Sequence, residues 1–130
     1  MKNLLHLFRN ASWTRVLLMA AIVILSCAFS AKAFAGQISE HEKIAYLLNA
    51  IGSSDLVFIR NKTEYTGAEA KAHLQEKMDS AGDVIRTAED FIDYIASESL
   101  TTGIPYYVRL ADGTQVESGI WLRGKLAKMK

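Results

Sequence analysis

At 130 residues the chain has room for one domain, and half of its residues are hydrophobic. The formal net charge of +1 is unevenly distributed: four of the 15 basic residues, and none of the 14 acidic ones, fall within residues 1–35. The remaining 95 residues therefore keep 11 basic side chains against 14 acidic ones, a net charge of −3. A mildly acidic domain without a basic run argues against nucleic-acid binding.

The first 35 residues have the layout of a secretory signal peptide. Lys2, Arg9 and Arg15 form a positive region, an apolar run covers residues 16–29, and Ala33-Phe34-Ala35 supplies a small-x-small cleavage site. A membrane anchor needs about 20 apolar residues, which is longer than this run. We expect cleavage after Ala35 and a domain spanning residues 36–130.

Cys27, the only cysteine, leaves an alternative open. Residues 24–27, Ile-Leu-Ser-Cys, resemble a bacterial lipobox, in which Cys27 would carry a lipid anchor. Cleavage after Ala35 would instead leave no cysteine, so that no disulfide stabilises the domain. A chain of about 95 residues must then rely on one modest hydrophobic core.

The first predicted helix begins with a capping box formed by Ser39 and Glu42. Gly52 is its expected left-handed stop. The apolar stripe that faces the core has helical spacing and comprises Ile44, Leu47, Leu48 and Ile51.

A hairpin and a second helix follow. Residues 56–59 and 63–65 have strand character on either side of a turn at Asn61-Lys62. Thr66 and Glu69 form a second capping box, and Gly82 ends or bends this helix.

The second half of the domain repeats the pattern. Thr87 caps a third helix with apolar residues at 88, 91, 92 and 95, and Asp112-Gly113 joins strands 106–110 and 114–117. Ser118 is the expected cap of a final helix that includes Trp121, Leu126 and Met129. The order helix, hairpin, helix, helix, hairpin, helix predicts an α+β fold in a small single domain.

Several segments are informative together: His41-Glu42, FIRN at 58–61, Tyr65 with EAKAHL at 69–74, TAEDFIDYIAS at 87–97 and TGIPYYV at 102–108. In combination they resemble the YfeK-like family of short exported bacterial proteins, which is built on a domain of unknown function. The resemblance covers nearly all of residues 36–130 and implies a periplasmic protein of a Gram-negative bacterium. It supplies no catalytic residue.

Arg60 is the strongest candidate for a binding residue. A guanidinium on an apolar strand is expected to be partly buried and to need partners. Glu69, Glu89 or Tyr65 are candidates for a purely structural pair. The alternative is a shallow anion-binding pocket, whose predicted lining is Arg60, Tyr65, His73 and Tyr106.

Catalysis has less support. Glu69, His73 and Lys77 lie four residues apart on one helix face, so a small hydrolase using His73 and Glu69 is the competing hypothesis. A surface row of i, i+4 bonds explains the same spacing. No nucleophile elbow is present, and His41, Glu42 and His73 lack the spacing of a zinc site. We therefore assign no catalytic residue, metal or cofactor.

These observations predict a non-catalytic binding or accessory module of the bacterial cell envelope. Its expected partner is an envelope protein or a small anionic ligand. Contact with the membrane is expected only through the signal peptide, or through a lipidated Cys27 in the alternative interpretation. A surface used only for assembly is a third alternative.

Overall fold

The computed structural model describes residues 36–129, and from Ile38 onward the chain forms one compact unit. The predicted signal peptide and Cys27 lie outside the described residues. Among the residues it does describe, no helix combines the length and the apolar character needed to cross a bilayer.

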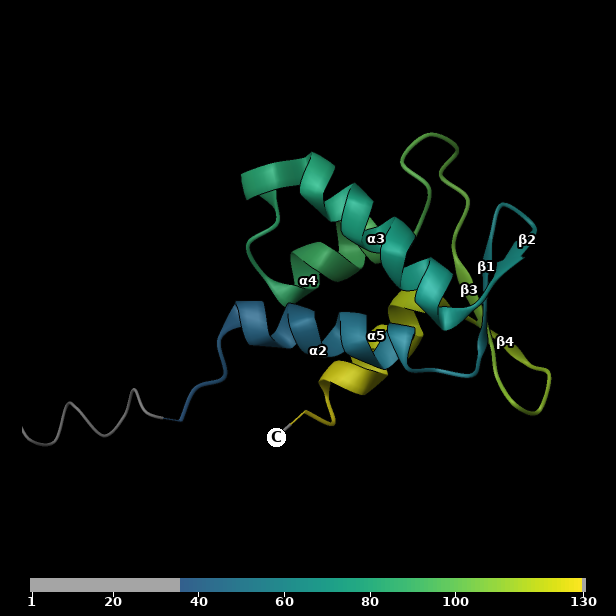
Figure 1. Ribbon diagram of the computed structural model, residues 1–130, viewed down its shortest axis with the longest axis horizontal. Coiled ribbons are helices and arrows are strands. Elements are labelled where there is room, and N and C mark those ends of the chain that lie inside the picture. Colours follow the sequence, from purple (N-terminus) through teal and green to yellow (C-terminus); the bar gives the residue numbers. More distant parts are fainter. Residues whose placement is uncertain (1–35, 130) are drawn as a thin grey trace, which may run out of the picture. The chain divides into compact units, whose positions relative to one another are not determined.

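The predicted order of elements is confirmed, and the unit is an α+β domain. Figure 1 shows the arrangement. In chain order the elements are α2 (Glu40–Gly52), β1 (Val57–Arg60), β2 (Thr63–Tyr65), α3 (Gly67–Ala81), the 3-10 turn η1 (Gly82–Val84), α4 (Ala88–Asp90), the π-helix η2 (Phe91–Ala96), β3 (Tyr107–Arg109), β4 (Gln115–Glu117) and α5 (Ser118–Leu126).

Three helices begin with a capping box. The boxes at Ser39 and Thr66 are confirmed, and Thr87 forms a third box with Asp90. Each box satisfies backbone N–H groups that have no partner inside the first turn. The predicted stop at Gly82 is also confirmed, since Gly82 follows α3 with φ at 59°.

Three predicted helix boundaries are wrong. Gly52 is the last helical residue of α2 and has no left-handed backbone, because the N–H and hydroxyl of Ser53 both donate to the Asn49 carbonyl. Ser118 does not cap α5 but is its first residue, and its N–H donates to the Tyr106 carbonyl at 2.8 Å. Helix α5 ends at Leu126, so Met129 lies beyond it.

The two predicted hairpins join into one antiparallel sheet with the order β2-β1-β3-β4. In the first hairpin Asn61 and Lys62 have φ of 49° and 66°, which is the left-handed conformation of a two-residue type I′ turn. Strand β1 pairs with β3 so that Phe58 lies opposite Val108. This pairing connects the two halves of the domain.

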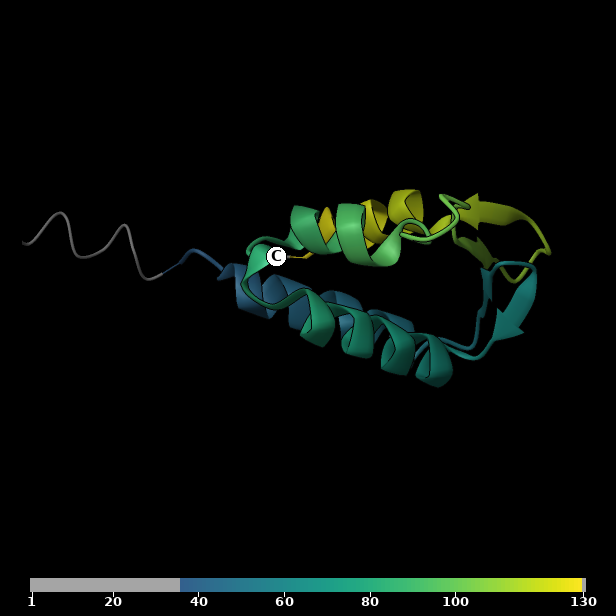
Figure 2. The ribbon, with the colours of Figure 1, turned by 90° about the horizontal axis from the view of Figure 1, so that it is seen from above.

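The helices form two layers, and the sheet lies at one end of both. Figure 2 shows α2 beside α3 in one layer, and α4 with η2 beside α5 in the other. The Phe58 ring meets Trp121 edge-on at 5.7 Å between centroids. The core between the layers is apolar, and its largest fully buried side chains are Phe91, Leu47, Ile51, Ile92, Ile95, Leu122 and Val108.

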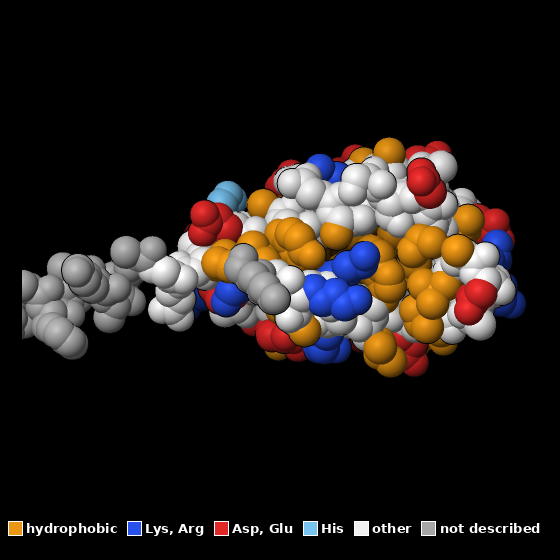
Figure 3. Space-filling view, turned by 90° about the horizontal axis from the view of Figure 1, so that it is seen from below, with side chains coloured by type: hydrophobic (Ala, Val, Ile, Leu, Met, Phe, Trp, Pro, Cys, Tyr) orange, Lys and Arg blue, Asp and Glu red, His pale blue; other side chains and the backbone are white. Residues whose placement is uncertain are grey.

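Apolar side chains also reach the surface. Seen from below in Figure 3, they lie around a small basic group. On α5, the Trp121 ring is only partly buried and the Lys125 ammonium lies 5.0 Å from its centroid, while Ile120 is 62% exposed. Helix α5 therefore has apolar residues on both its core side and its outer side.

Gly67, the first residue of α3, lies directly against the backbone at the end of α2. A Cβ added there would lie 2.7 Å from the Ser54 carbonyl oxygen and closer still to that of Ile51. Backbone atoms cannot move aside as a flexible side chain does, so only glycine fits.

We predict that Gly67→Ala lowers the free energy of unfolding by about 2 kcal/mol, the usual range for an overpacked site. Gly124→Ala is the matched control, because a Cβ at Gly124 in α5 meets nothing within 4 Å. That control should be neutral or slightly stabilising, since alanine favours helix more than glycine does. Urea denaturation of both purified variants measures the difference, and equal stabilities would contradict the close approach.

Candidate functional site

A pocket of about 360 Å³ lies between α3, strand β1 and the loop of residues 97–106, which connects η2 to β3. All four residues of the predicted site line it: Arg60, Tyr65, His73 and Tyr106. The structure thus brings together residues that are up to 46 positions apart in the sequence. Phe58, Leu74 and Tyr107 add apolar and aromatic wall.

Arg60 lies at this pocket with its side chain exposed, so the expectation of a partly buried guanidinium is wrong. It sits at the end of β1, where the strand leaves the sheet. Its predicted acidic partners are engaged elsewhere: Glu69 bonds to Thr66, and Glu89 accepts from Arg123 at 3.1 Å. Within residues 36–129 no carboxylate forms an ion pair with Arg60. Its guanidinium carbon lies 6.0 Å from the centroid of Tyr106.

Tyr65 and His73 form one aromatic wall. Tyr65 is the last residue of β2 and His73 lies on α3, and their rings meet edge to face with centroids 5.1 Å apart. His73 is exposed and Tyr65 is half-buried. The pair therefore presents ring edges and a phenol to the pocket rather than a buried catalytic histidine.

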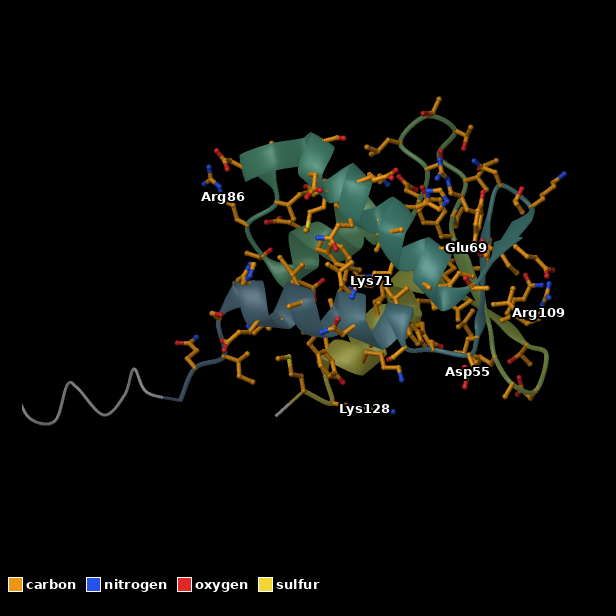
Figure 4. The ribbon with its side chains drawn as sticks, in the orientation of Figure 1. Asp55, Glu69, Lys71, Arg86, Arg109 and Lys128 are labelled. Atoms are coloured by element: carbon orange, nitrogen blue, oxygen red, sulfur yellow. The ribbon has the colours of Figure 1, made fainter. Side chains whose placement is uncertain are left out.

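Glu69 does not orient His73. Its carboxylate accepts from the Thr66 N–H at 2.8 Å and from the Thr66 hydroxyl at 2.9 Å, as expected of the capping box. These bonds to the Thr66 backbone and side chain lower the pKa of Glu69. Figure 4 shows Glu69 at the end of α3 nearest the sheet. The Glu69–His73 pair of the hydrolase hypothesis is therefore not joined by a hydrogen bond here.

Lys77 also lines the pocket, although the predicted site did not include it. Its ammonium donates to the carbonyls of Ile95 and Glu98, each at 2.8 Å, and lies 5.2 Å from the Tyr106 ring centroid. Burial lowers the pKa of Lys77, and the nearby Arg60 charge lowers it further. The sequence places Lys77 one helical turn after His73. Its hydrogen-bond acceptors, however, are 18 and 21 residues away along the chain, so no local pattern indicates them.

Tyr106 forms the floor between the two cations. It is 8% exposed, and burial raises the pKa of its phenol. Arg60 and Lys77 both lie over its ring within the range of cation–π attraction. Cation–π attraction to the Tyr106 ring thus favours the position of two positive charges near the same pocket.

The 97–106 loop forms the rim of the pocket. The Ser99 N–H donates to the Ile104 carbonyl, and the Gly103 N–H donates back to the Ser99 carbonyl, which closes the loop on itself. Leu100 stands on this rim and is 70% exposed. The Thr102 hydroxyl contacts the Asn61 amide oxygen at 3.3 Å, so the rim is tied to the β1–β2 turn.

The pocket lining combines aromatic, aliphatic, basic and hydroxyl side chains with one acidic residue, Glu76. Aromatic and aliphatic walls surround two cations, and the part of the chain described in the structure holds no cluster of three His, Cys, Asp or Glu residues suited to a metal. Ser99 and Ser118 also line the pocket, at 5% and 4% exposure, but His73 makes no hydrogen bond to either hydroxyl among the described residues.

Because Arg60 is exposed and makes no ion pair with a described residue, we predict that Arg60→Ala changes the free energy of unfolding by less than about 0.5 kcal/mol. Arg123→Ala is the comparison. Because Arg123 forms ion pairs with both Glu89 and Asp93, its loss should lower the free energy of unfolding by more than the loss of Arg60 does. Thermal and urea denaturation of both variants test this. A larger loss for Arg60→Ala would mean that Arg60 supports the fold.

Comparison with known proteins gives a family without an assigned activity. The uncharacterized protein YfeK of Salmonella typhimurium (strain LT2) is 43% identical over 68 residues, which make up 52% of this chain and 57% of that relative. The chain thus matches little more than half of the relative's length, and no solved structure matches it. Residues 38–130 match the model of a family of unknown function, DUF5329. The resemblance expected from the sequence is confirmed, and the chain belongs to this family.

Proposed function

We propose that this protein is a non-catalytic binding module that takes a small amphipathic anion into the pocket between α3, β1 and the 97–106 loop. The observation that carries the proposal is the pairing of two cations, Arg60 and Lys77, with aromatic walls in one concavity. Neither cation forms an ion pair within the described residues, so each has capacity for an anionic partner.

Size and lining support a small organic ligand. A volume of about 360 Å³ falls at the lower end of pockets that bind small molecules, which are mostly apolar with a few polar groups. Phe58, Leu74 and Tyr106 supply apolar surface, and Arg60 supplies charge at the mouth. A purely polar anion would leave these walls without a partner.

The proposed location is the periplasm. The basic start, the apolar run and the Ala33-Phe34-Ala35 site support export with cleavage after Ala35. A lipid anchor on Cys27 is the alternative. In either case the binding module would act in the cell envelope, as an accessory that holds a ligand rather than converts it.

We predict that a panel of small aromatic and aliphatic carboxylates contains compounds that bind saturably and shift the backbone amide signals of the pocket residues in NMR titrations. Arg60→Ala should weaken such binding by about twofold or more, because a positive charge at the mouth of the pocket is lost. Arg86→Ala is the matched control: Figure 4 shows Arg86 at the end of the domain far from the sheet, and it does not line the pocket.

Two outcomes would contradict the binding proposal. One is that no compound of the panel saturates a site. The other is that the shifted amides lie elsewhere and that Arg60→Ala and Arg86→Ala bind alike. Because Arg60→Ala is expected to keep its stability, a loss of binding in this variant reports on contact rather than on folding.

We further predict that the protein recovered from the periplasm of an expressing bacterium begins at Gly36. Intact mass spectrometry measures this directly. Cys27→Ala should leave processing unchanged, because Cys27 lies within the segment that is removed. A chain that retains residues 1–35 would contradict export with cleavage, and a lipidated Cys27 would establish the anchor instead.

A further inference from the structure

We propose that Lys77 is the residue that fixes the ligand's charged group, and that this group is a carboxylate carried on an apolar or aromatic body. This inference rests on the proposed function and assigns the main contact with the anion to the inner cation, Lys77, with Arg60 at the mouth as a weaker second contact.

The geometry holds the Lys77 ammonium in place. An ammonium has three N–H donors. Two of them are used by the carbonyls of Ile95 and Glu98, at the end of η2 and just beyond it, each at 2.8 Å. The third has no acceptor among the residues that the structure describes. A lysine side chain is ordinarily flexible, so this anchoring removes much of the entropy that binding would otherwise cost.

The charge of Lys77 is only partly balanced. The two carbonyls contribute partial negative charge, as the end of a helix does. Glu98 and Glu76 are the nearby acids, yet no carboxylate oxygen of residues 36–129 lies within 4.0 Å of the ammonium. Lys77 is half-buried, where a charge interacts more strongly than in water. An anion entering the pocket would therefore gain most at Lys77.

The donor set favours a carboxylate over a phosphate. Lys77 has one remaining N–H, which suits one carboxylate oxygen, whereas phosphate sites gather several donors around one group, often backbone N–H groups. The Tyr106 ring, 5.2 Å from the ammonium, lies beside the same position. It gives the body that carries the carboxylate an aromatic surface to pack on.

The experiment compares 3-phenylpropanoate with its neutral amide, 3-phenylpropanamide, by NMR titration or calorimetry. The two probes have the same shape and differ in charge. For the wild-type protein the acid should bind about tenfold more tightly than the amide, as expected for a hydrogen bond to a charged group. In Lys77→Met the two probes should bind within about twofold of one another.

The matched control is Lys71→Met on the same helix. Lys71 donates to the Asn49 side chain at 2.9 Å and does not line this pocket, and Figure 4 marks its position on α3. This variant should keep the tenfold preference. Since Lys77→Met also removes two bonds to carbonyls, Lys77→Gln, which keeps an N–H donor without the charge, provides a second variant if the first folds poorly. The preference is a ratio within one variant, so a general loss of affinity does not change it.

Each outcome is decisive. A preference that persists in Lys77→Met and disappears in Arg60→Met would assign the anion to Arg60 and overturn the inference. Equal binding of acid and amide to the wild-type protein would also overturn it, while leaving a binding pocket. Tighter binding of 2-phenylethyl phosphate than of 3-phenylpropanoate would overturn the carboxylate assignment. Failure of every probe to bind would instead count against the proposed function.

Discussion

The pairing of β1 with β3 is the constraint on which the rest of the domain depends. Each hairpin alone is a short two-stranded ribbon, which is at best marginally stable in water. Their pairing places Phe58 opposite Val108 in the centre of the sheet and brings α3 against the loop that precedes β3. Both walls of the pocket come from these two halves. The same backbone bonds that complete the sheet therefore also create the concavity.

Lys77 adds a second connection between the halves, and it combines architecture with electrostatics. Its long side chain leaves α3 and satisfies carbonyls at the end of η2, which have no partner within the helix. A neutral donor would satisfy the carbonyls equally well. The lysine instead brings a positive charge beside the Tyr106 ring, close to Arg60. Two like charges near one pocket make the electrostatic free energy of binding an anion more favourable.

Local patterns made much of the fold predictable. The boxes at Ser39 and Thr66, the cap at Thr87 and the turn at Asn61-Lys62 each depend on residues within four positions. The pairing of the two hairpins and the acceptors of Lys77 depend on contacts between distant segments, for which no local signal exists. The absence of a local signal also explains the error at Arg60. Its place on a strand was predicted correctly, but the exposure of its side chain depends on how α3 and the 97–106 loop pack around it. Ser118 is the first residue of α5 rather than its cap, and its N–H donates to a distant carbonyl, that of Tyr106, which no local pattern indicates.

The sheet order has a consequence for a chain that emerges from its N-terminus. Strand β1 is central in the finished sheet, yet its second neighbour, β3, begins 47 residues after Arg60. Until β3 arrives, the first hairpin has an open edge with an apolar residue, Phe58, at its middle. Such edges invite pairing with foreign strands. An incomplete copy of this protein is therefore most prone to aggregation after the first hairpin has formed and before β3 is available to pair with β1.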